Sequence, residues 1–450
     1  MEIKLVTGYE NHRWHCGSFQ YSIVSAVSDE VSGSYYYKDG FAVMADATSL
    51  LCFACDEQKY QMLEAEFRRQ IKAAEPQRYN QITAIRDYYF KNSPEKKKQI
   101  WLIMDRPDRA DDNAEAFFRY MAERAEPDID LYFILSRKSE AYSKLSRIGK
   151  VIEPFSEEHK KLYTVADYMI SSQMAESTIN PFNNDLKYFR DLFRNPKQIF
   201  LQHGVIHNDH GSTLNKYNRD FFGFVTSAKA EYNYLLSSKF HYTEQEMWLA
   251  GMPRFDFLYR NDKRKITIMP TWRKFLTTRV FDEKSGTMIW KVNDDFTDSE
   301  YFRFFNNLIN NEKLLDAADR YGYKICFMPH VIFLKEAEKF AHNSRITIYN
   351  YEKSYREIYA ESSLIVTDYS SAVFDFSYLR QPIIYTQFDF DEFYSKHTVR
   401  KGYFNFKKDG FGEVTDNQED TVNLIIGYMA DNCRLKPEYR ERIDNFFDFS

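Results

Sequence analysis

Short apolar runs separated by helical segments recur between residues 99 and 385, and this alternation constrains the fold more than any other sequence feature. A first series of runs lies at 99–104, 131–135, 168–171, 199–202 and 222–226. A second series lies at 266–269, 323–328, 346–349, 364–366 and 383–385. Each run has the length of a buried strand, and strands that alternate with helices form a mainly parallel sheet. Two successive series predict two Rossmann-like α/β domains that face a cleft.

Composition and charge exclude several classes of protein. The 450 residues carry a net charge of −5, and the isoelectric point is near 6.1. A nucleic-acid binder normally has a basic footprint, so we expect no nucleic-acid partner. The five cysteines are too few and too scattered for a disulfide framework. Cys52 and Cys55 have CxxC spacing, but no second pair completes a four-ligand zinc site, so we do not favour metal or redox use.

The first 97 residues differ from the rest of the chain. Strand-like runs at 19–25, 34–37 and 41–44 predict a small β-rich appendage over residues 1–55. Residues 56–97 are predicted to form a helical linker, whose apolar residues recur at i, i+4 spacing. Acidic residues accompany its basic ones, which favours a packed or linking helix over a helix lying on a membrane. No apolar run approaches 18 residues and no signal peptide is evident, which predicts a cytoplasmic protein or one on the cytoplasmic face of a membrane.

Candidate functional residues follow the ends of predicted strands. His203 and Gly204 follow one strand, Arg273 and His330 follow two others, and residues 367–371 follow a fourth. In open parallel sheets, ligands bind at the carboxyl ends of the strands. The shared placement therefore predicts one site at the cleft between the two domains.

Residues 355–389 contain the most specific local pattern. The strand at 364–366 leads into Thr367-Asp368-Tyr369-Ser370-Ser371 and then into a predicted helix at 372–379. Ser370 or Ser371 is suited to cap that helix, and a helix N-terminus offers free N–H groups to a phosphate. A capped helix of an ordinary α/β domain would have the same local pattern. Elsewhere, Asp112 with Glu115 predicts a capping-box start for a helix at 113–124.

Seven short motifs together carry a family resemblance, and they occur in order along the chain. They are Arg106-Pro107, Asn113-Ala114-Glu115, Leu201-Gln202-His203-Gly204, Gly251-Met252-Pro253-Arg254-Phe255-Asp256, Pro270-Thr271-Trp272-Arg273, Pro329-His330, and the 367–371 stretch followed by Phe374-Asp375. The sequence closely resembles the CDP-glycerol glycerophosphotransferase family, which includes teichoic acid polymerases, primases and related capsule enzymes. The resemblance spans residues 98–415. Residues 1–55 have no recognisable counterpart, and relatives continue beyond residue 450, so we expect a fragment of a longer polypeptide.

The resemblance implies a GT-B-type fold and transfer of a polyol phosphate from CDP-glycerol or CDP-ribitol to a hydroxyl acceptor. Residues 98–250 would then form the acceptor and base domain and residues 251–420 the CDP-donor domain, with a helical segment at 421–450. The acceptor hydroxyl would attack the donor's β-phosphorus and CMP would leave, which requires positioning, a base and groups that stabilise phosphate charge. The family's proposed general base corresponds to His203. His330 would either hydrogen-bond the diphosphate or protonate the departing CMP.

The remaining site residues are assigned through the same resemblance. Arg273, through its planar fork, would clamp the diphosphate. The other donor phosphate-binding residues are Thr367, Ser370 and Ser371. Gly204, Asp368 and Asp375 would position the donor or the polyol. The ordinary alternatives are a surface arginine for Arg273, a core or helix-capping histidine for His203, and a strand-end histidine held by backbone carbonyls for His330.

No metal ligands and no tightly bound cofactor are expected. His207 and His210 follow His203, but they lie in a polar loop rather than on one face of a helix. Mg²⁺ can accompany the donor diphosphate without a protein cage. Many relatives carry a lysine-containing sequence where this chain has Asn208 and Asp209, so the acceptor is left open.

Three functional hypotheses follow. The first is a CDP-polyol phosphotransferase that builds a teichoic-acid or capsule polymer, with glycerol and ribitol equally compatible. The acceptor would be a polyol-phosphate or glycan polymer, with or without a lipid link, met at the inner face of the membrane by a cytoplasmic or peripheral enzyme. The second is a GT-B glycosyltransferase that uses a nucleotide sugar. The third is a binding module that has kept the fold and lost the chemistry, although the candidate catalytic residues are all present.

Overall fold

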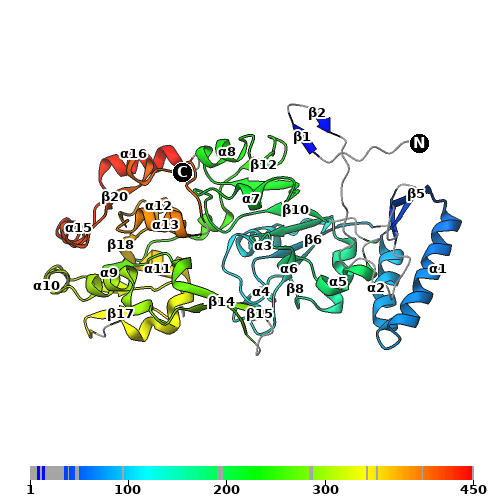
Figure 1. Cartoon of the computed structure of the whole chain (residues 1–450), viewed down its shortest axis with the longest axis horizontal. Coiled ribbons are helices and arrows are strands. Elements are labelled where there is room, and N and C mark those ends of the chain that lie inside the picture. Colours follow the sequence, from blue (N-terminus) through cyan, green and yellow to red (C-terminus); the bar gives the residue numbers. More distant parts are fainter. Residues whose placement is uncertain are drawn as a thin grey trace.

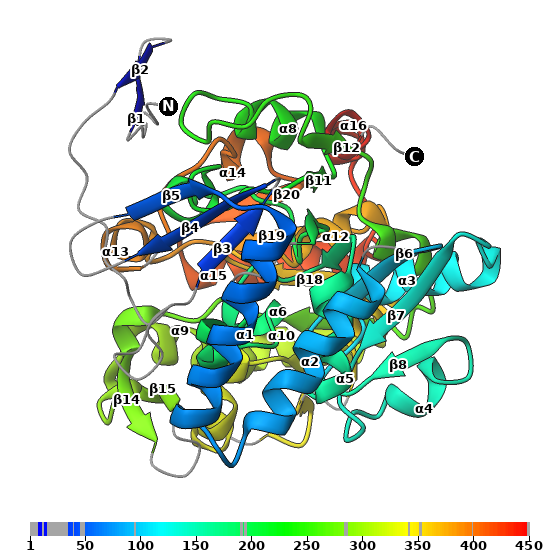
Figure 2. The ribbon, with the colours of Figure 1, turned by 90° about the vertical axis from the view of Figure 1, so that its right-hand side faces the viewer.

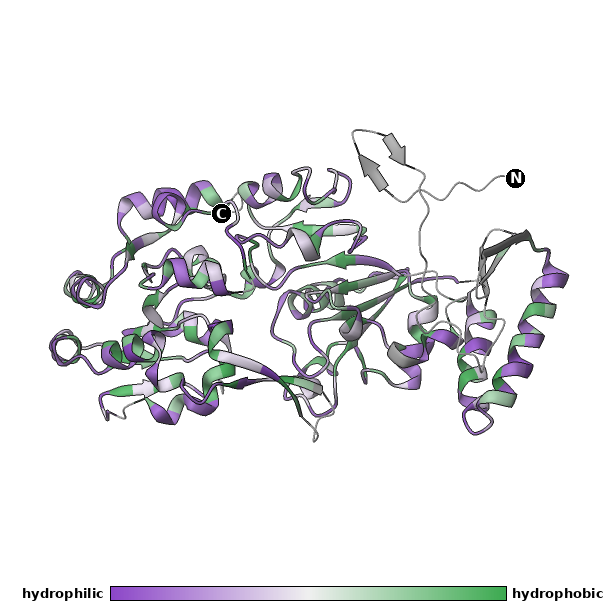
Figure 3. Ribbon diagram, in the orientation of Figure 1, coloured by the Kyte–Doolittle hydropathy of each residue, from purple (hydrophilic) through white to green (hydrophobic). Residues whose placement is uncertain are grey.

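Two parallel β-sheets form the body of the protein (Figure 1). The computed structural model describes residues 8–10, 13–15, 35–38, 40–45, 50–93, 96–189, 192, 196–282, 287–340, 343–350, 353–397 and 399–447. Within them, the first sheet has seven strands and the second has six. Figure 3 shows hydrophobic residues along many of these strands, whereas helices at the periphery alternate between hydrophilic and hydrophobic residues.

The first sheet has the strand order β12-β11-β10-β9-β6-β7-β8. Counted from β6, this is the Rossmann order 3-2-1-4-5-6 with one further strand at the edge. Its strands are β6 (Gln99–Met104), β7 (Ile129–Ile134), β8 (Lys150–Ile152), β9 (Tyr168–Ser171), β10 (Lys197–Phe200), β11 (Gly223–Thr226) and β12 (Met247–Leu249). The five predicted strands are confirmed. The sequence analysis missed β8 and β12, which have three residues each and show too short a pattern.

Helices cover both faces of the first sheet. They are α1 (Glu57–Ala74), α2 (Tyr79–Asn92), α3 (Asn113–Arg124), α4 (Tyr142–Leu145), α5 (Glu157–Val165), α6 (Glu176–Ile179), α7 (Gly211–Leu214) and α8 (Lys229–Leu235), with 3-10 turns at Asn183–Tyr188 and Pro253–Phe257. Buried residues of α1, α2 and α5 pack with Ile100, Leu102 and Met104 of β6. The side chains of Ile103 and Phe133 point to the other face, where α3 and α4 pack. Successive residues of β6 thus alternate between two cores, as the pleat of a strand requires.

The second sheet repeats the same topology. Its order is β17-β16-β13-β18-β19-β20, again 3-2-1-4-5-6 along the chain. The strands are β13 (Lys265–Ile268), β16 (Lys324–Phe327), β17 (Ile346–Ile348), β18 (Ser362–Thr367), β19 (Ile383–Thr386) and β20 (Gly412–Thr415). The five predicted strands of this series are confirmed, and β20 was missed.

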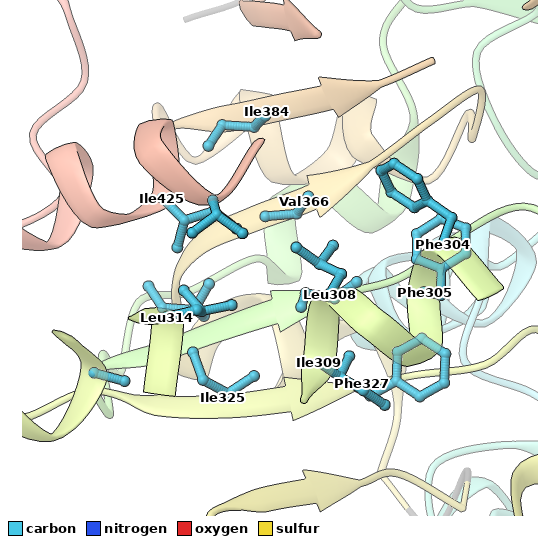
Figure 4. Close-up of a cluster of buried hydrophobic side chains, with 14 of the residues drawn as sticks. Phe304, Phe305, Leu308, Ile309, Leu314, Ile325, Phe327, Val366, Ile384 and Ile425 are labelled. Carbon is cyan, nitrogen blue, oxygen red and sulfur yellow. The ribbon is translucent and has the colours of Figure 1, made fainter. Parts of the chain in front are cut away.

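The helices of the second half also form two layers. They are α9 (Glu300–Ile309), α10 (Glu312–Tyr321), α11 (Tyr355–Glu361), α12 (Val373–Tyr378), α13 (Phe390–Lys396), α14 (Phe406–Asp409), α15 (Gln418–Ala430) and α16 (Pro437–Phe446), with 3-10 turns at Lys274–Leu276, Phe296–Asp298 and Val331–Lys339. Figure 4 shows Val366 and Ile384 of the sheet against Leu308, Leu314 and Ile425 of α9, α10 and α15. The opposite core contains buried residues of α11, α12, α13, α14 and α16. A hairpin, β14 (Thr277–Asp282) and β15 (Thr287–Val292), extends from this half.

Smaller sheets lie at the N-terminal end. Strands β3 (Tyr35–Lys38), β4 (Phe41–Ala45) and β5 (Leu50–Ala54) form an antiparallel sheet near α1 (Figure 2). Strands β1 (Gly8–Glu10) and β2 (Arg13–His15) pair separately. The predicted runs at 34–37 and 41–44 are therefore confirmed as strands, and the predicted run at 19–25 lies outside the described residues.

Several helix predictions were too coarse. The helical region at 57–91 is two helices, α1 and α2, and the region at 300–320 is divided into α9 and α10 at Asn311, which caps α10. The helix predicted at 113–124 is confirmed as α3, with Asp112 at its N-cap, but the capping box of Asp112 with Glu115 was wrong. The Asp112 carboxylate accepts the Asn113 N–H at 2.8 Å, and Glu115 pairs with Arg119 instead.

Two Rossmann-like sheets whose carboxyl edges border one cavity define a GT-B-type arrangement. The predicted fold class is therefore confirmed. The sheets lie within residues 99–249 and 265–415, and the domain boundaries at residues 55, 97, 250 and 420 stay predictions.

Candidate active site

A cavity of about 610 Å³ lies between the two halves of the protein. It is lined by residues that follow strands of both sheets, namely Asp105 after β6, His203 after β10, Pro270 after β13, His330 after β16 and Ser370 after β18. The cavity therefore has the position that parallel α/β sheets give to their ligands. Of the predicted site residues, His203, Gly204, His330, Ser370, Ser371 and Asp375 line it, whereas Arg273, Thr367 and Asp368 do not.

His203 is held in one tautomer by the backbone. Its Nδ1 lies 3.2 Å from the carbonyl oxygen of Ser172. A carbonyl can only accept, so Nδ1 carries the proton and Nε2 is left as an unprotonated base. The side chain is exposed to the cavity. Desolvation by the cavity walls lowers the pKa of His203, and Arg254 and Arg106 lower it further, whereas Asp112 and the hydrogen bond to Ser172 raise it. The imidazole therefore stays neutral and able to accept a proton.

The backbone before His203 is unusual. Gln202 has φ +64°, a left-handed conformation that is uncommon for a residue other than glycine. Asn113 at the start of α3 donates its amide hydrogens to the carbonyls of Leu201 at 3.2 Å and Gln202 at 2.9 Å. The Gln202 side chain in turn donates to the Val225 carbonyl. These bonds hold a conformation that the chain would otherwise disfavour, and such positions are common at functional sites.

The segment after His203 is fixed by a buried carboxylate. Glu231 on α8 accepts the backbone N–H of Ile206 at 2.6 Å and that of Ser227 at 2.8 Å. Burial raises the pKa of Glu231 to about 7, against these hydrogen bonds. Sequence reasoning missed both Asn113, which it quoted only as part of a motif, and Glu231, for which no local pattern gave a signal.

The loop that carries His203 lies close to the turn that contains Ser370 and Ser371, the serine turn. A Cβ placed on Gly204 would lie 3.1 Å from the Oγ of Ser371. Ser370 Oγ accepts the N–H of Ala372 at 3.2 Å. The predicted cap of the following helix was wrong in detail, because α12 begins at Val373 after Ala372, which makes no side-chain cap bond. Ser370 closes the preceding turn instead, and both serines remain at the cavity wall.

His330 follows β16 on the side of the second sheet. Its Nδ1 accepts the N–H of Ile332 at 3.3 Å, so a neutral ring carries its proton on Nε2. Burial lowers the pKa of His330 to about 4. The ring stacks on Trp272, with centroids 6.1 Å apart. A neutral ring with a fixed Nε2–H is a hydrogen-bond donor, which favours contact with a diphosphate over proton donation to CMP.

Arg273 lies beneath the site rather than in it. The side chain is fully buried, and its guanidinium bonds Asp389 at 2.6 and 3.0 Å, Asp368 at 2.9 Å and the Thr271 carbonyl at 2.7 Å. No N–H group is presented to the cavity, so this geometry disagrees with the predicted diphosphate clamp. The difference arises because partners unseen in the local motif occupy every branch of the guanidinium, namely the carboxylates of Asp389 and Asp368 and the carbonyl of Thr271.

Thr367 and Asp368 support the serine turn from behind. Thr367 donates its hydroxyl to the Met269 carbonyl at 2.8 Å. One Asp368 oxygen accepts the N–H of Thr271 at 2.8 Å and that of Tyr369 at 2.6 Å. Both side chains are fully buried. They tie β13 to β18, the two strands at which the order of the second sheet reverses, and do not reach the cavity themselves.

Arg254 joins the two halves of the cavity. Its guanidinium pairs with both oxygens of Asp375 at 2.7 and 2.8 Å and with Asp112 at 2.5 Å. Its backbone N–H donates to Asn113 at 3.1 Å. Asn113 is the residue that holds Leu201 and Gln202. A continuous set of bonds therefore connects Asp375, beside the serine turn, with the backbone that positions His203. The sequence analysis assigned Asp375 but no role to Arg254.

The other histidines of the loop have different environments. His207 is buried among Phe374, Phe404 and Phe406, and burial lowers its pKa to about 4. His210 is half-buried at the cavity wall. The described part of the chain contains no group of three or more His, Cys, Asp or Glu side chains that could hold a metal ion. Nor does any described helix have both the length and the apolar character needed to cross a membrane.

The fold and the site define an α/β protein of the GT-B type, in which a neutral histidine and a serine turn line the same cavity. The family profile described as CDP-Glycerol:Poly(glycerophosphate) glycerophosphotransferase matches residues 87–450. This chain belongs to that family.

Two relatives with curated names are considerably longer than this chain. It is 38% identical over 355 residues to the minor teichoic acid biosynthesis protein GgaB of Bacillus subtilis, covering 79% of this chain and 38% of that protein. It is 24% identical over 266 residues to the teichoic acid poly(glycerol phosphate) polymerase of B. subtilis, covering 52% of this chain and 32% of that protein. The chain thus spans well under half the length of these two relatives.

A solved structure of the wall teichoic acid polymerase TagF has a similar fold. The TM-score is 0.57 at 16% identity, and the alignment covers 87% of this chain and 93% of that one. At this identity the likeness supports the fold and says nothing of individual site residues.

Proposed function

We propose that this chain transfers a polyol phosphate from CDP-glycerol or CDP-ribitol to a hydroxyl of a teichoic-acid or capsule polymer and releases CMP. The observation that carries the proposal is the neutral His203, whose Nε2 is left free by the Ser172 carbonyl and whose neighbour Gly204 approaches Ser371, in a cavity bordered by both sheets. Family membership supports the reaction class. Relatives named for teichoic acid synthesis support the polymer.

The proposed reaction uses three groups of the site, namely His203, the serine turn and His330. Nε2 of His203 removes the proton of the acceptor hydroxyl, whose oxygen forms a bond to the donor's β-phosphorus. The bond from that phosphorus to the bridging oxygen breaks, and CMP leaves with the electron pair. The serine turn and the Nε2–H of His330 donate hydrogen bonds to the phosphate oxygens as charge shifts toward CMP.

Mg²⁺ can travel with the donor diphosphate, held by phosphate oxygens and water rather than by a protein cage. We further propose a cytoplasmic enzyme that meets a polymer or lipid-linked acceptor at the inner face of the membrane, on the basis of the family alone.

The test is CMP release from CDP-glycerol and, separately, CDP-ribitol, with a short polyol-phosphate acceptor. The wild type is compared with His203→Ala and with a matched control, His241→Asn. His241 is exposed, lies outside the cavity and has φ +61°, which asparagine tolerates. Release with one donor that is lost in His203→Ala and kept in the control supports the proposal and identifies the polyol. Failure of the wild type to bind either donor refutes it and favours a nucleotide-sugar donor.

A further inference from the structure

Charged groups are concentrated on the cavity wall, and most of them are already paired. Arg254 pairs with Asp112 and Asp375. Three further cations are neutralised by nearby acids, in the pairs Arg119–Glu115, Arg356–Asp111 and Lys353–Glu361. These pairs account for the exposed and half-exposed acids of the wall, since Asp105 is buried under the start of α3.

Arg106 and Arg109 are the exception. Both line the cavity and both are exposed. Neither side chain forms an ion pair with any described residue. Asp108, which lies between them in sequence, is exposed but does not line the cavity. The wall therefore presents two uncompensated guanidinium groups to whatever enters.

The backbone that carries these arginines is held in place. The N–H of Arg106 donates to the Arg109 carbonyl at 3.1 Å, and the N–H of Ser136 donates to the Pro107 carbonyl at 2.8 Å. Behind the loop, the buried Asp105 carboxylate accepts the N–H groups of Ala114 at 2.9 Å and Glu115 at 3.0 Å. The loop therefore connects β6 to α3 in one fixed shape, and its two cations have less freedom to lose on binding an anion.

The position of the loop indicates which substrate these cations contact. It follows β6 in the first sheet, the sheet that also carries His203, and the charge of Arg106 acts on the His203 imidazole. The serine turn and His330 belong to the second sheet. A base must stand beside the hydroxyl that it deprotonates, so the acceptor occupies the side of the cavity bordered by the first sheet.

We infer that Arg106 and Arg109 form a subsite for a phosphate of the acceptor, close to the hydroxyl that His203 deprotonates. The inference rests on the proposed function. Guanidinium groups bind phosphate oxygens through paired N–H donors, and an unpaired arginine on a cavity wall is suited to this role. The subsite selects a phosphate-bearing polymer end over a neutral glycan end. The donor diphosphate is bound by the serine turn and His330 instead.

The test compares Arg106→Gln, Arg109→Gln and the double variant with wild type. Arg137→Gln is the matched control, because Arg137 is an exposed arginine of the same half that does not line the cavity. Two acceptors of similar length are used, an oligomer of glycerol phosphate and a phosphate-free oligosaccharide or polyol. The measurements are KM for donor and acceptor, and direct binding of the glycerol phosphate oligomer in the absence of donor.

The expected result is a rise in the KM and Kd of the phosphate-bearing acceptor of about fivefold for each single variant and about twentyfold for the double variant, as the loss of charge-assisted hydrogen bonds predicts. The donor KM and the activity with the phosphate-free acceptor should not change in these variants. The Arg137→Gln control should have the same constants as wild type. Higher salt should weaken oligomer binding to wild type more than to the double variant.

Other outcomes overturn the inference. A rise in the donor KM instead would assign the two arginines to the donor diphosphate, and unchanged constants for both substrates would leave them without a substrate role. Failure of wild type to bind the oligomer, although it releases CMP with another acceptor, would exclude a phosphate-bearing acceptor. These results differ from failure of the proposed function, in which wild type binds neither CDP-activated donor.

Discussion

Replacing Arg254 with methionine tests whether its ion pairs with Asp112 and Asp375 hold the two halves of the site together. The side chain is 16% exposed, and its partners Asp112 and Asp375 are 21% and 8% exposed. Methionine has a similar length and fills the apolar part of the space, but it leaves both carboxylates without a cation. Asp375 lies beside the serine turn, and Asp112 lies beside Asn113, which holds the Gln202 backbone. The change should therefore loosen the site as well as the fold.

The magnitude follows from the contacts. Three charge-assisted hydrogen bonds are lost, each worth about 1.5–3 kcal/mol when considered alone. Their sum overstates the effect because cavity water can partly solvate the two carboxylates, and removal of one partner from a buried pair typically costs about 3–5 kcal/mol. We therefore expect the free energy of unfolding to fall by about 3 kcal/mol. Arg254→Lys keeps the charge but cannot hold both carboxylates through a planar fork, so a smaller loss is expected.

Arg345 provides a matched control. It also forms three charge-assisted hydrogen bonds, to the carboxylates of Glu312, Asp316 and Asp319, but these are 73%, 66% and 67% exposed. Exposed pairs contribute little to stability because water and salt screen them, so Arg345→Met should have little effect. Denaturant unfolding of the two variants gives the comparison, and kcat at saturating substrates measures the loosening of the site. Equal stability losses, or an Arg254→Met enzyme with unchanged kcat, would refute the reasoning.

Three further predictions concern separate residues. Arg273→Met should lower the free energy of unfolding by about 3–5 kcal/mol, because it leaves buried carboxylates unpaired; a stable variant with only a raised donor KM would restore the clamp interpretation. Gly204→Ala should weaken donor binding by roughly fivefold, because the new methyl group crowds Ser371 at a position that needs no left-handed backbone. Isothermal titration of donor binding measures this, and an unaltered Kd would show that the close approach has no functional role. The pKa of His207 is lowered to about 4, so between about pH 6.5 and 4 the unfolded chain takes up a proton that the folded chain does not. Stability should therefore fall with acidification by up to about 1.4 kcal/mol per pH unit from this group. His207→Phe should remove that part of the slope in denaturant titrations across this range, and an unchanged slope would contradict the assignment.

Strand periodicity predicted most of the fold. Ten buried strands were found because each is an apolar run bounded by polar turns, and their alternation with helices sufficed to predict two parallel sheets. The strands that were missed, such as β8, β12 and β20, have only three or four residues, and β8 and β20 also contain Lys150 and Glu413 where an apolar core pattern was expected. Helix breaks were missed where a polar pair, Asn310-Asn311, interrupts an otherwise continuous amphipathic pattern.

The site was predicted less completely than the fold. Residues directly after strands, such as His203, His330 and Ser371, could be placed at the cavity because parallel strands end at one edge of a sheet. The direction of a side chain is not encoded so locally. Arg273 follows a strand in the same way, yet Asp389, more than a hundred residues later, turns it into the interior. Arg254 and Asn113 acquire their roles from partners in distant segments, and no spacing within either motif could show those contacts.

The central claim is that this chain moves a polyol phosphate, and the product of a single incubation tests it most directly. Purified enzyme, a CDP-activated polyol and a short polyol-phosphate acceptor are incubated, and acceptor mass and CMP are measured together. The account predicts that each acceptor molecule extended gains one polyol phosphate for every CMP released, and that His203→Ala yields neither product. Release of CMP without extension of the acceptor, or extension by a sugar from a nucleotide-sugar donor, would contradict it.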